Sequence, residues 1–115
     1  MLIKGTRLSK KKDFDAIFKK GKSVKSSFLI LKFMQNGLKI NRFAFMVSKK
    51  VSLKAVVRNK IRRRLSESVK DFRKETETGI DIIFVTLPTI KEKSFIEIKE
   101  EVNNLLTKII LKNKI

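Results

Sequence analysis

The feature that most constrains the fold is a basic segment, residues 58–64, set inside an amphipathic helical pattern. Five of its seven side chains are cationic and a sixth is an amide, so Ile61 is its one apolar residue. Apolar residues recur through and beyond it at the spacing of one helix face: Val57, Ile61, Leu65, Val69 and Phe72. The pattern predicts a helix from about Ala55 to Lys74 with one face packed on a core.

The opposite side of this helix is predicted to carry cations without acids. Its residues are Asn59, Arg62, Arg63, Ser66, Lys70 and Arg73. Glu67 and Asp71 fall on a flank, where pairing with cations one turn away can partly neutralise them. Solvated helix faces usually mix both signs, so a face with one sign indicates a polyanionic partner. A simple solvated face is the alternative interpretation.

Charge and composition limit the chemistry that the protein can carry out. The net charge is +18, and residues 1–74 hold 23 Lys and Arg against 4 Asp and Glu, whereas residues 75–115 hold 6 against 7. Histidine and cysteine are absent, which excludes disulfides, thiolate nucleophiles, histidine bases and the common zinc sites. The acid pairs Asp13/Asp15 and Glu100/Glu101 diverge on a helix. We therefore predict neither a catalytic nor a metal-binding set of side chains.

The organisation indicates one domain spanning residues 1–115. No repeat, low-complexity tract or Pro/Gly linker interrupts the chain, and its length suits one core. No apolar run exceeds five residues, and no segment has the length of a signal-peptide core. We expect a soluble intracellular protein.

The first half of the chain predicts a helix followed by strands. Ser9 is a candidate N-cap, a stripe of Phe14, Ile17 and Phe18 follows, and Gly21 ends the helix. Residues 28–34 and 43–47 are apolar and β-prone, with the turn dipeptide Asn36-Gly37 between them. These two runs are predicted to form an antiparallel hairpin.

The second half predicts a buried strand and a closing helix. Residues 80–85 are mostly apolar and stop before Pro88. Ser94 and Glu97 have capping-box spacing, and beyond them lies one apolar stripe made of Ile98, Val102, Leu105, Leu106 and Ile109. With the basic helix between the strands, the order is α-β-β-(β)-α-β-α. The economical fold is an α/β (α+β) two-layer sandwich with a single sheet of about four strands.

Three stretches give the chain a resemblance to a known family. They are residues 7–23, with Arg7-Leu8, Asp13-Phe14, Ile17-Phe18 and Gly21-Lys22-Ser23; Val47-Ser48-Lys49-Lys50; and Ala55 to Arg63, with Arg58-Asn59-Lys60-Ile61-Arg62-Arg63. In this order they resemble the protein subunit of bacterial ribonuclease P. The resemblance implies a small α/β sandwich in which a left-handed crossover surrounds the basic helix, although generic rules favour the right-handed connection.

The resemblance also implies a function. In this family the catalytic component is an RNA, and the protein helps it bind precursor tRNA and remove the 5′ leader. Mg²⁺ would be held mainly by RNA and phosphates. The implied partners are the catalytic RNA and precursor tRNA in the bacterial cytoplasm, with no membrane and no protein partner. A basic ribosomal protein that binds rRNA is the competing class, and a DNA-binding module is a weaker third, because no helix-turn-helix pair precedes the basic helix.

Two sets of site residues follow from the resemblance. For the catalytic RNA they are Arg58, Asn59, Lys60, Arg62, Arg63, Arg64 and Lys70, and for the tRNA leader Phe14, Phe18, Leu31, Ser48, Lys49 and Lys50. Asn59 has an alternative role as a cap or structural hydrogen-bonding residue. Phe14 and Phe18 are core residues on spacing alone; the resemblance places them in a leader-binding cleft, with Ile17 as the core member.

Some positions depart from the family pattern. Ser66 stands where an Arg is usual and Arg64 where an apolar residue is usual, so the cationic face is expected to turn toward Arg64. Leu31 occupies a strand position that is aromatic in several relatives. Phe43, Phe45 and Phe84 are assigned to the core.

Overall fold

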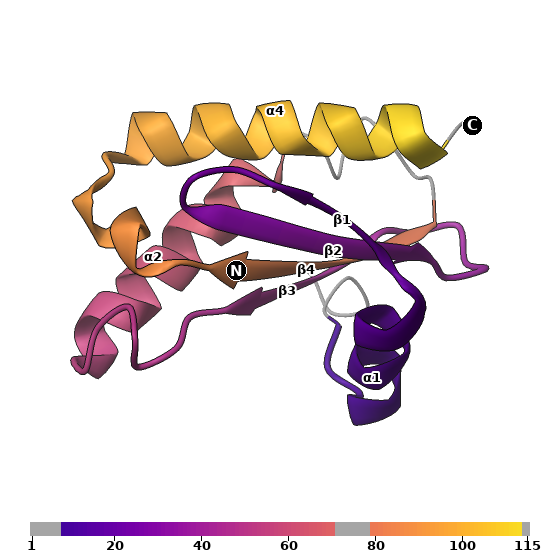
Figure 1. Ribbon diagram of the computed structural model, residues 1–115, viewed down its shortest axis with the longest axis horizontal. Helices are drawn as coiled ribbons and strands as arrows, with labels where there is room; N and C mark the ends of the chain where they lie inside the picture. Colours follow the sequence, from indigo (N-terminus) through magenta and orange to yellow (C-terminus); the bar gives the residue numbers. More distant parts are fainter. Residues whose placement is uncertain (1–7, 71–78, 114–115) are drawn as a thin grey trace.

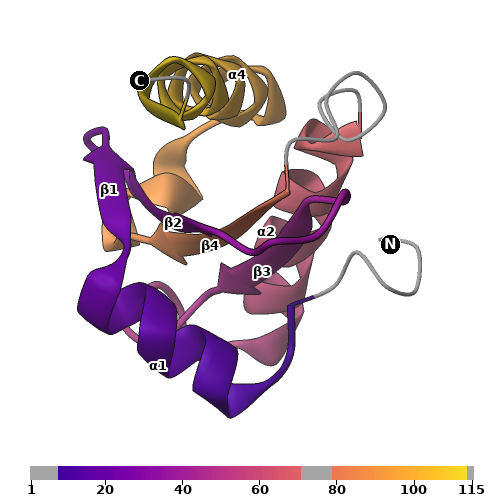
Figure 2. The same cartoon turned by 90° about the vertical axis from the view of Figure 1, so that its right-hand side faces the viewer.

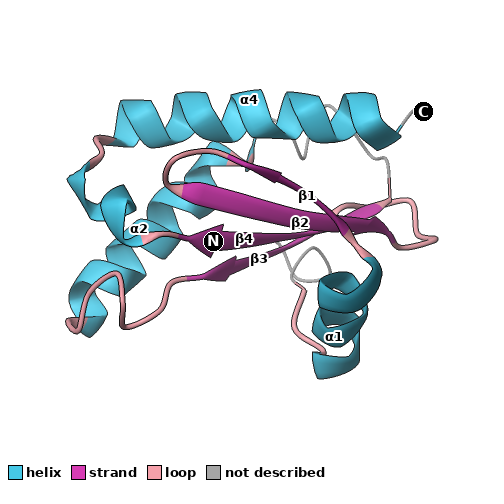
Figure 3. Ribbon diagram, in the orientation of Figure 1, coloured by secondary structure: helices cyan, strands magenta, loops and turns pink. Residues whose placement is uncertain are grey.

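The computed structural model describes residues 8–70 and 79–113. Its strands form one open sheet in the order β1-β2-β4-β3 (Figure 1). The elements, in chain order, are α1 (Lys11–Lys20), β1 (Lys22–Lys25), β2 (Leu29–Gln35), β3 (Arg42–Met46), α2 (Ala55–Ser68), β4 (Ile80–Thr86), the 3₁₀ helix η1 (Pro88–Glu92) and α4 (Phe95–Asn113). The predicted α+β class with a four-stranded sheet is confirmed (Figure 3).

The helices lie on both faces of the sheet. Helix α4 covers one face together with α2, whereas α1 lies on the other (Figure 2). The first face holds the larger core cluster, which we call the closed face. We call the α1 side the open face, because a short helix covers only part of it.

The predicted hairpin between the second and third strands is wrong. Strand β4 lies between them, antiparallel to β2 and parallel to β3. All but one of its seven residues are buried, Val85 being the exception. Such a strand is most stable at the centre of a sheet, with a neighbour on each edge and cover on both faces. The turn at Gly37, which has a φ of 73°, therefore separates two strands that do not pair with each other.

The parallel pair β3 and β4 requires a crossover connection, because a tight turn cannot join parallel strands. Helix α2 lies within this connection. The basic helix thus lies, in chain order, between two strands that are neighbours in the sheet. The crossover agrees with the family resemblance, and its left hand stays a prediction.

Helix α1 begins differently from its sequence prediction, whereas its end before Gly21 agrees with it. Its N-cap is Lys10, without a side-chain cap, so Ser9 does not cap it. Gly21 follows the helix as predicted, but its φ of −72° is available to any residue. Glycine is needed there because an added Cβ would collide with the carbonyl oxygens of Ile17 and Phe33. Close packing of the chain on β2 sets this position.

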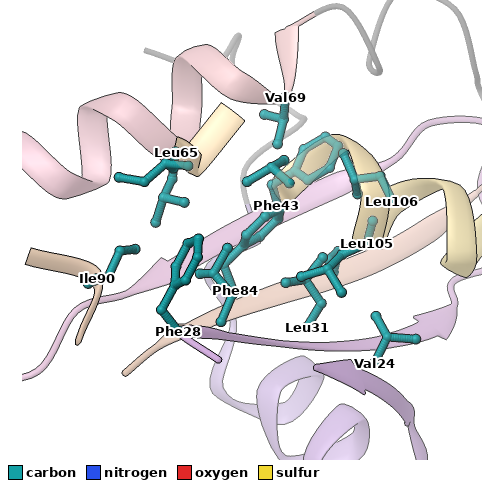
Figure 4. Close-up of a cluster of buried hydrophobic side chains, with 14 of the residues drawn as sticks. Val24, Phe28, Leu31, Phe43, Leu65, Val69, Phe84, Ile90, Leu105 and Leu106 are labelled. Carbon is teal, nitrogen blue, oxygen red and sulfur yellow. The ribbon is translucent and has the colours of Figure 1, made fainter. Parts of the chain in front are cut away.

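The closed face carries most of the apolar core (Figure 4). Phe43 and Phe84 are fully buried with ring centroids 6.5 Å apart, and half-buried Phe45 packs 5.1 Å from Phe84. The predicted stripe of α4 is entirely buried in the same core cluster; it consists of Ile98, Val102, Leu105, Leu106 and Ile109. The three phenylalanines belong to the core, as predicted.

The capping box at the start of α4 is confirmed. The Ser94 N–H donates to Glu97 Oε1 at 3.0 Å, and the Glu97 N–H donates to Ser94 Oγ at 3.2 Å. The hydrogen bond from the Ser94 backbone lowers the pKa of Glu97. Over the described residues, none of the helices combines the length and apolarity needed to cross a membrane.

Candidate nucleic-acid interface

The cations of helix α2 lie between residues 58 and 64. Residues 49–54 form the connector between strand β3 and this helix. The helix ends at Ser68, and the predicted continuation through 71–74 lies outside the described residues. Its first turn holds no acid. Of the residues assigned to catalytic RNA, Asn59, Lys60 and Arg63 are exposed, whereas Arg58, Arg62, Arg64 and Lys70 are half-buried. The basic motif is therefore a mixture of open and tethered side chains.

Arg62 joins the helix to the end of strand β3. Its Nη1 donates to Asn59 Oδ1 at 2.7 Å and its Nη2 to the Val47 carbonyl at 3.2 Å. These contacts hold the guanidinium in one place and orient the Asn59 amide. The structural role considered for Asn59 is therefore present, and it leaves the amide nitrogen available for another partner.

Arg58 has a comparable structural contact. Its Nη1 donates to the carbonyl oxygens of Ser52 and Leu53, both at 3.0 Å. The connector before α2 is thereby fastened to the first turn of the helix. This leaves other guanidinium donors of Arg58 for an external acceptor.

Two residues of the predicted cationic face behave differently from expectation. Ser66 is 3% exposed, and its buried Oγ has no hydrogen-bond partner among the described residues. The Lys70 ammonium forms an ion pair with Glu67 at 2.9 Å, which lowers the pKa of Glu67. An acid therefore does reach this end of the face. The cation-rich surface is concentrated on residues 58–64.

The open face of the sheet holds the second candidate surface. Phe18 on α1 is 42% exposed, with the Lys32 ammonium 5.8 Å from its ring centroid. Ile17 is fully buried, as predicted, and half-buried Phe14 packs against the small cluster beside it. Phe18 is thus a surface residue, whereas Phe14 is partly a core residue.

Beside Phe18 the open face continues as a partly exposed apolar row. Ile30, Val85 and Met46 occupy matching positions on β2, β4 and β3, and Lys25 pairs with Ile30 on β1. Ile30 and Val85 are half-buried and Met46 is exposed. The row offers an apolar surface with a cation at its β1 end.

Leu31 does not belong to this surface. Side chains alternate between the two faces of a strand, so Leu31 points to the opposite side from Lys32. It is fully buried and lies beside Leu105 in the main core (Figure 4). The assignment of Leu31 to leader binding is therefore corrected to a core role, and Lys32 is the β2 residue next to Phe18.

Ser48, Lys49 and Lys50 form an exposed turn after β3. The Lys50 N–H donates to Ser48 Oγ at 3.3 Å, and the Val51 N–H to the Ser48 carbonyl at 3.1 Å. Both lysines are exposed. The turn directly follows Val47, whose carbonyl accepts from Arg62, so it is the point where the α2 surface meets the end of the sheet.

A partly buried ion pair beneath α1 was not predicted from the sequence. Arg42 donates to both carboxylate oxygens of Asp81 at 2.7 and 2.6 Å, and Asn36 Nδ2 donates to the same carboxylate at 2.8 Å. The hydrogen bond to Asp81 raises the pKa of Arg42. Arg42 also reaches Asp13 of α1 at 3.6 Å. A lone acid inside an apolar strand was the available signal, and its partner lies on a strand 39 residues away.

Acidic side chains do not form a metal-binding cluster in the part of the chain that the structure describes. Within residues 8–70 and 79–113, no group of three or more Asp or Glu residues is arranged to hold a metal ion.

Fold and surfaces define a small, strongly basic α+β protein with a partly open sheet face and a cation-rich crossover helix. A family model described as Ribonuclease P matches residues 2–110. The chain therefore belongs to the ribonuclease P protein family, whose members are protein components of a tRNA-processing endoribonuclease. This assignment favours ribonuclease P over the ribosomal and DNA-binding classes.

Individual relatives agree over nearly the whole chain. The ribonuclease P protein component of Caldanaerobacter subterraneus subsp. tengcongensis is 38% identical over 108 residues, covering 94% of this chain and 92% of that protein. That of Alkaliphilus oremlandii is 40% identical and covers 93% of each. The Staphylococcus aureus RNase P protein structure has a TM-score of 0.84 at 31% identity, covering 92% of this chain and 96% of that one. The Thermotoga maritima protein has a TM-score of 0.80 at 30% identity, covering 89% and 96%.

Proposed function

We propose that this protein binds the catalytic RNA of ribonuclease P through α2 and the 5′ leader of precursor tRNA through the open sheet face. The observation that carries the proposal is the Arg62–Val47 contact, 3.2 Å long, which fastens the basic helix to the strand that ends in the Ser48–Lys50 turn. It holds two cation-bearing surfaces in a fixed relation. One protein could then contact two RNA segments at once.

On α2, the contacts proposed for catalytic RNA come from Arg58, Asn59, Lys60, Arg62, Arg63 and Arg64. Arginine suits this role because its planar fork can pair with two phosphate oxygens. The tethers on Arg58 and Arg62 reduce the rotamer entropy lost on binding. Arg63 and Lys60 are the exposed members that can follow an RNA backbone.

On the open face, the proposed leader contacts are Phe18, part of Phe14, Lys32 and the Ser48–Lys50 turn. Bases stack on aromatic side chains with little sequence preference, by about 1–3 kcal/mol per base. Lys32 beside the Phe18 ring adds a positive charge where a leader phosphate would lie. Such a surface suits leaders of differing sequence.

We further propose that the RNA carries the catalysis, with Mg²⁺ held mainly by phosphate oxygens, as its hard octahedral coordination favours. The protein contributes positioning and charge. Its place of action would be the bacterial cytoplasm.

Reconstitution tests the proposal. The full chain is added to a bacterial ribonuclease P RNA at low Mg²⁺, and cleavage of precursor tRNA is measured. We expect stimulation of leader removal by the mixture and no cleavage by the protein alone. Equal cleavage with and without the protein, or cleavage that survives removal of all RNA, would contradict it.

A further inference from the structure

A cavity on the outer side of α2 lies within the cation-rich surface. Its volume is about 470 Å³, and the described residues that line it are Val56, Asn59, Arg62 and Arg63. This volume is within the range of pockets that hold small ligands, about 300–1,000 Å³. The surface proposed to meet RNA is therefore hollowed at this point.

The polar part of this lining offers donors. Arginine has no acceptor, so the Asn59 oxygen must be the atom that faces Arg62, and the hydrogen bond of 2.7 Å uses it. The Asn59 amide then turns its two N–H groups away from Arg62. Arg62 and Arg63 add further donors and no acceptor. An occupant must supply acceptors, such as phosphate oxygens or the carbonyl and ring nitrogen atoms of a base.

The remaining lining residue is apolar. Val56 is 76% exposed although it belongs to a basic helix surface. A single exposed apolar residue needs no explanation by itself. Val56, however, shares the cavity with two arginines and an amide, so apolar surface, which makes up most of the lining, lies beside hydrogen-bond donors. A nucleotide has this same division, with an apolar base face and an anionic phosphate.

We propose that this cavity takes one unpaired nucleotide of the RNA partner, with the base or ribose against Val56 and the phosphate on Arg63. Asn59 donates to an acceptor edge of the base. The inference rests on the proposed function and refines it: α2 recognises an RNA segment with a nucleotide out of the stack, because protein recognition of RNA favours splayed, unpaired bases over the duplex interior.

The test compares two hairpin RNAs, one with a single-nucleotide bulge and one with a pairing nucleotide added opposite the bulge. Dissociation constants for the full chain are measured by fluorescence anisotropy at one fixed salt concentration. Val56→Ser removes the apolar wall without changing charge. Leu53→Ser is the matched control, because Leu53 is 82% exposed on the connector and is not among the lining residues.

We expect Val56→Ser to weaken binding of the bulged hairpin about three- to tenfold, as loss of partial apolar burial predicts, and to leave the paired hairpin within about twofold. Leu53→Ser should change neither. Val56→Thr, which keeps the branched shape, should show a smaller loss in the same direction. A circular dichroism melt verifies that each variant is folded.

Equal losses for both hairpins, or no loss for either, would overturn the nucleotide site and indicate a duplex-backbone contact. Equal effects of Val56→Ser and Leu53→Ser would also overturn it. Such a result leaves the proposed function standing if the chain still stimulates precursor tRNA cleavage in the reconstitution. Failure of that stimulation would instead count against the proposed function.

Discussion

Leu31 and Lys32 are neighbours on β2, yet they lie in opposite environments. Leu31 is fully buried under α4, whereas Lys32 is half-buried on the open face with its ammonium over the Phe18 ring. The closed face is filled by the side chains of two helices and the sheet. The open face has one ten-residue helix and a row of partly exposed apolar side chains.

The difference teaches how one sheet serves stability and binding together. A closed face contributes to the free energy of unfolding because its apolar area is removed from water. An open face contributes less, but it keeps apolar and cationic surface available to a ligand. Substitutions on the two faces should therefore separate into losses of stability and losses of RNA affinity.

The largest expected effect comes from breaking the ion pair between Arg42 and Asp81 on the open face. Arg42→Ala leaves the Asp81 carboxylate, whose side chain is 4% exposed, without its cation. Removing one partner of a buried pair costs about 3–5 kcal/mol. A urea melt measures it, and Arg42→Lys, which keeps the charge but loses the two-point contact, should lose less. A change below about 1 kcal/mol would mean that the pair is effectively solvated.

The next effect separates the two faces on one strand. Leu31→Ala should lower the free energy of unfolding by about 2–5 kcal/mol, because it opens a cavity in the core. Lys32→Ala, one residue away, should change stability little, since surface substitutions usually stay within about 0.5 kcal/mol. Denaturant melts of both variants decide the matter. Similar losses for the two would refute the contrast between the faces.

Phe18→Ala should mainly affect binding. Truncating a buried Phe costs about 3–5 kcal/mol of stability, and at 42% exposure Phe18 should cost clearly less. Affinity of the reconstituted complex should fall by about 1–3 kcal/mol for precursor tRNA and little for mature tRNA, which has no leader bases to stack. Equal losses for both tRNAs, with a melt shifted by several kcal/mol, would make Phe18 a core residue.

Arg62 and Arg63 are adjacent in sequence and should differ in effect. Arg63→Ala should make the slope of log K against log salt shallower by about 0.7–0.9 and leave folding unchanged, because one phosphate contact is lost. Arg62→Ala should also lower stability, by about 1.5–3 kcal/mol, through loss of its hydrogen bonds to Asn59 and Val47. Titrations at several salt concentrations and a melt test both. Identical behaviour would show that the Arg62 tether is without consequence.

The smallest expected effect concerns α4, which closes the core. The pKa of Glu97 is lowered in the folded state, so its contribution to stability is present above the unfolded pKa, near 4.5, and lost as pH falls through the folded value. Glu97→Gln should reduce thermal stability slightly at pH 7, and the deficit should be smaller at pH 3. Melts at both pH values measure this. An equal deficit at the two pH values would contradict the role of the charge.

Local signals in the sequence determined many of the structural features of this protein. The helical periodicity of α2 and α4, the capping box at Ser94, the turn at Gly37 and the core position of Ile17 depend on residues close together in the chain. The resemblance to the ribonuclease P protein family also rested on three short motif stretches. Such features are predictable because their energetics act within a turn or two of backbone.

Tertiary structure alone decided which strands pair and which cationic side chains remain exposed. Strand β4 displaced the expected hairpin because a strand buried on both faces gains most at the centre of the sheet. Leu31 is buried in the core, and Arg62 donates to the Val47 carbonyl. In both cases the contacting residues lie outside the element that carries the side chain. Pairings between distant segments depend on the packing of the whole chain, and that energy has no counterpart in local sequence.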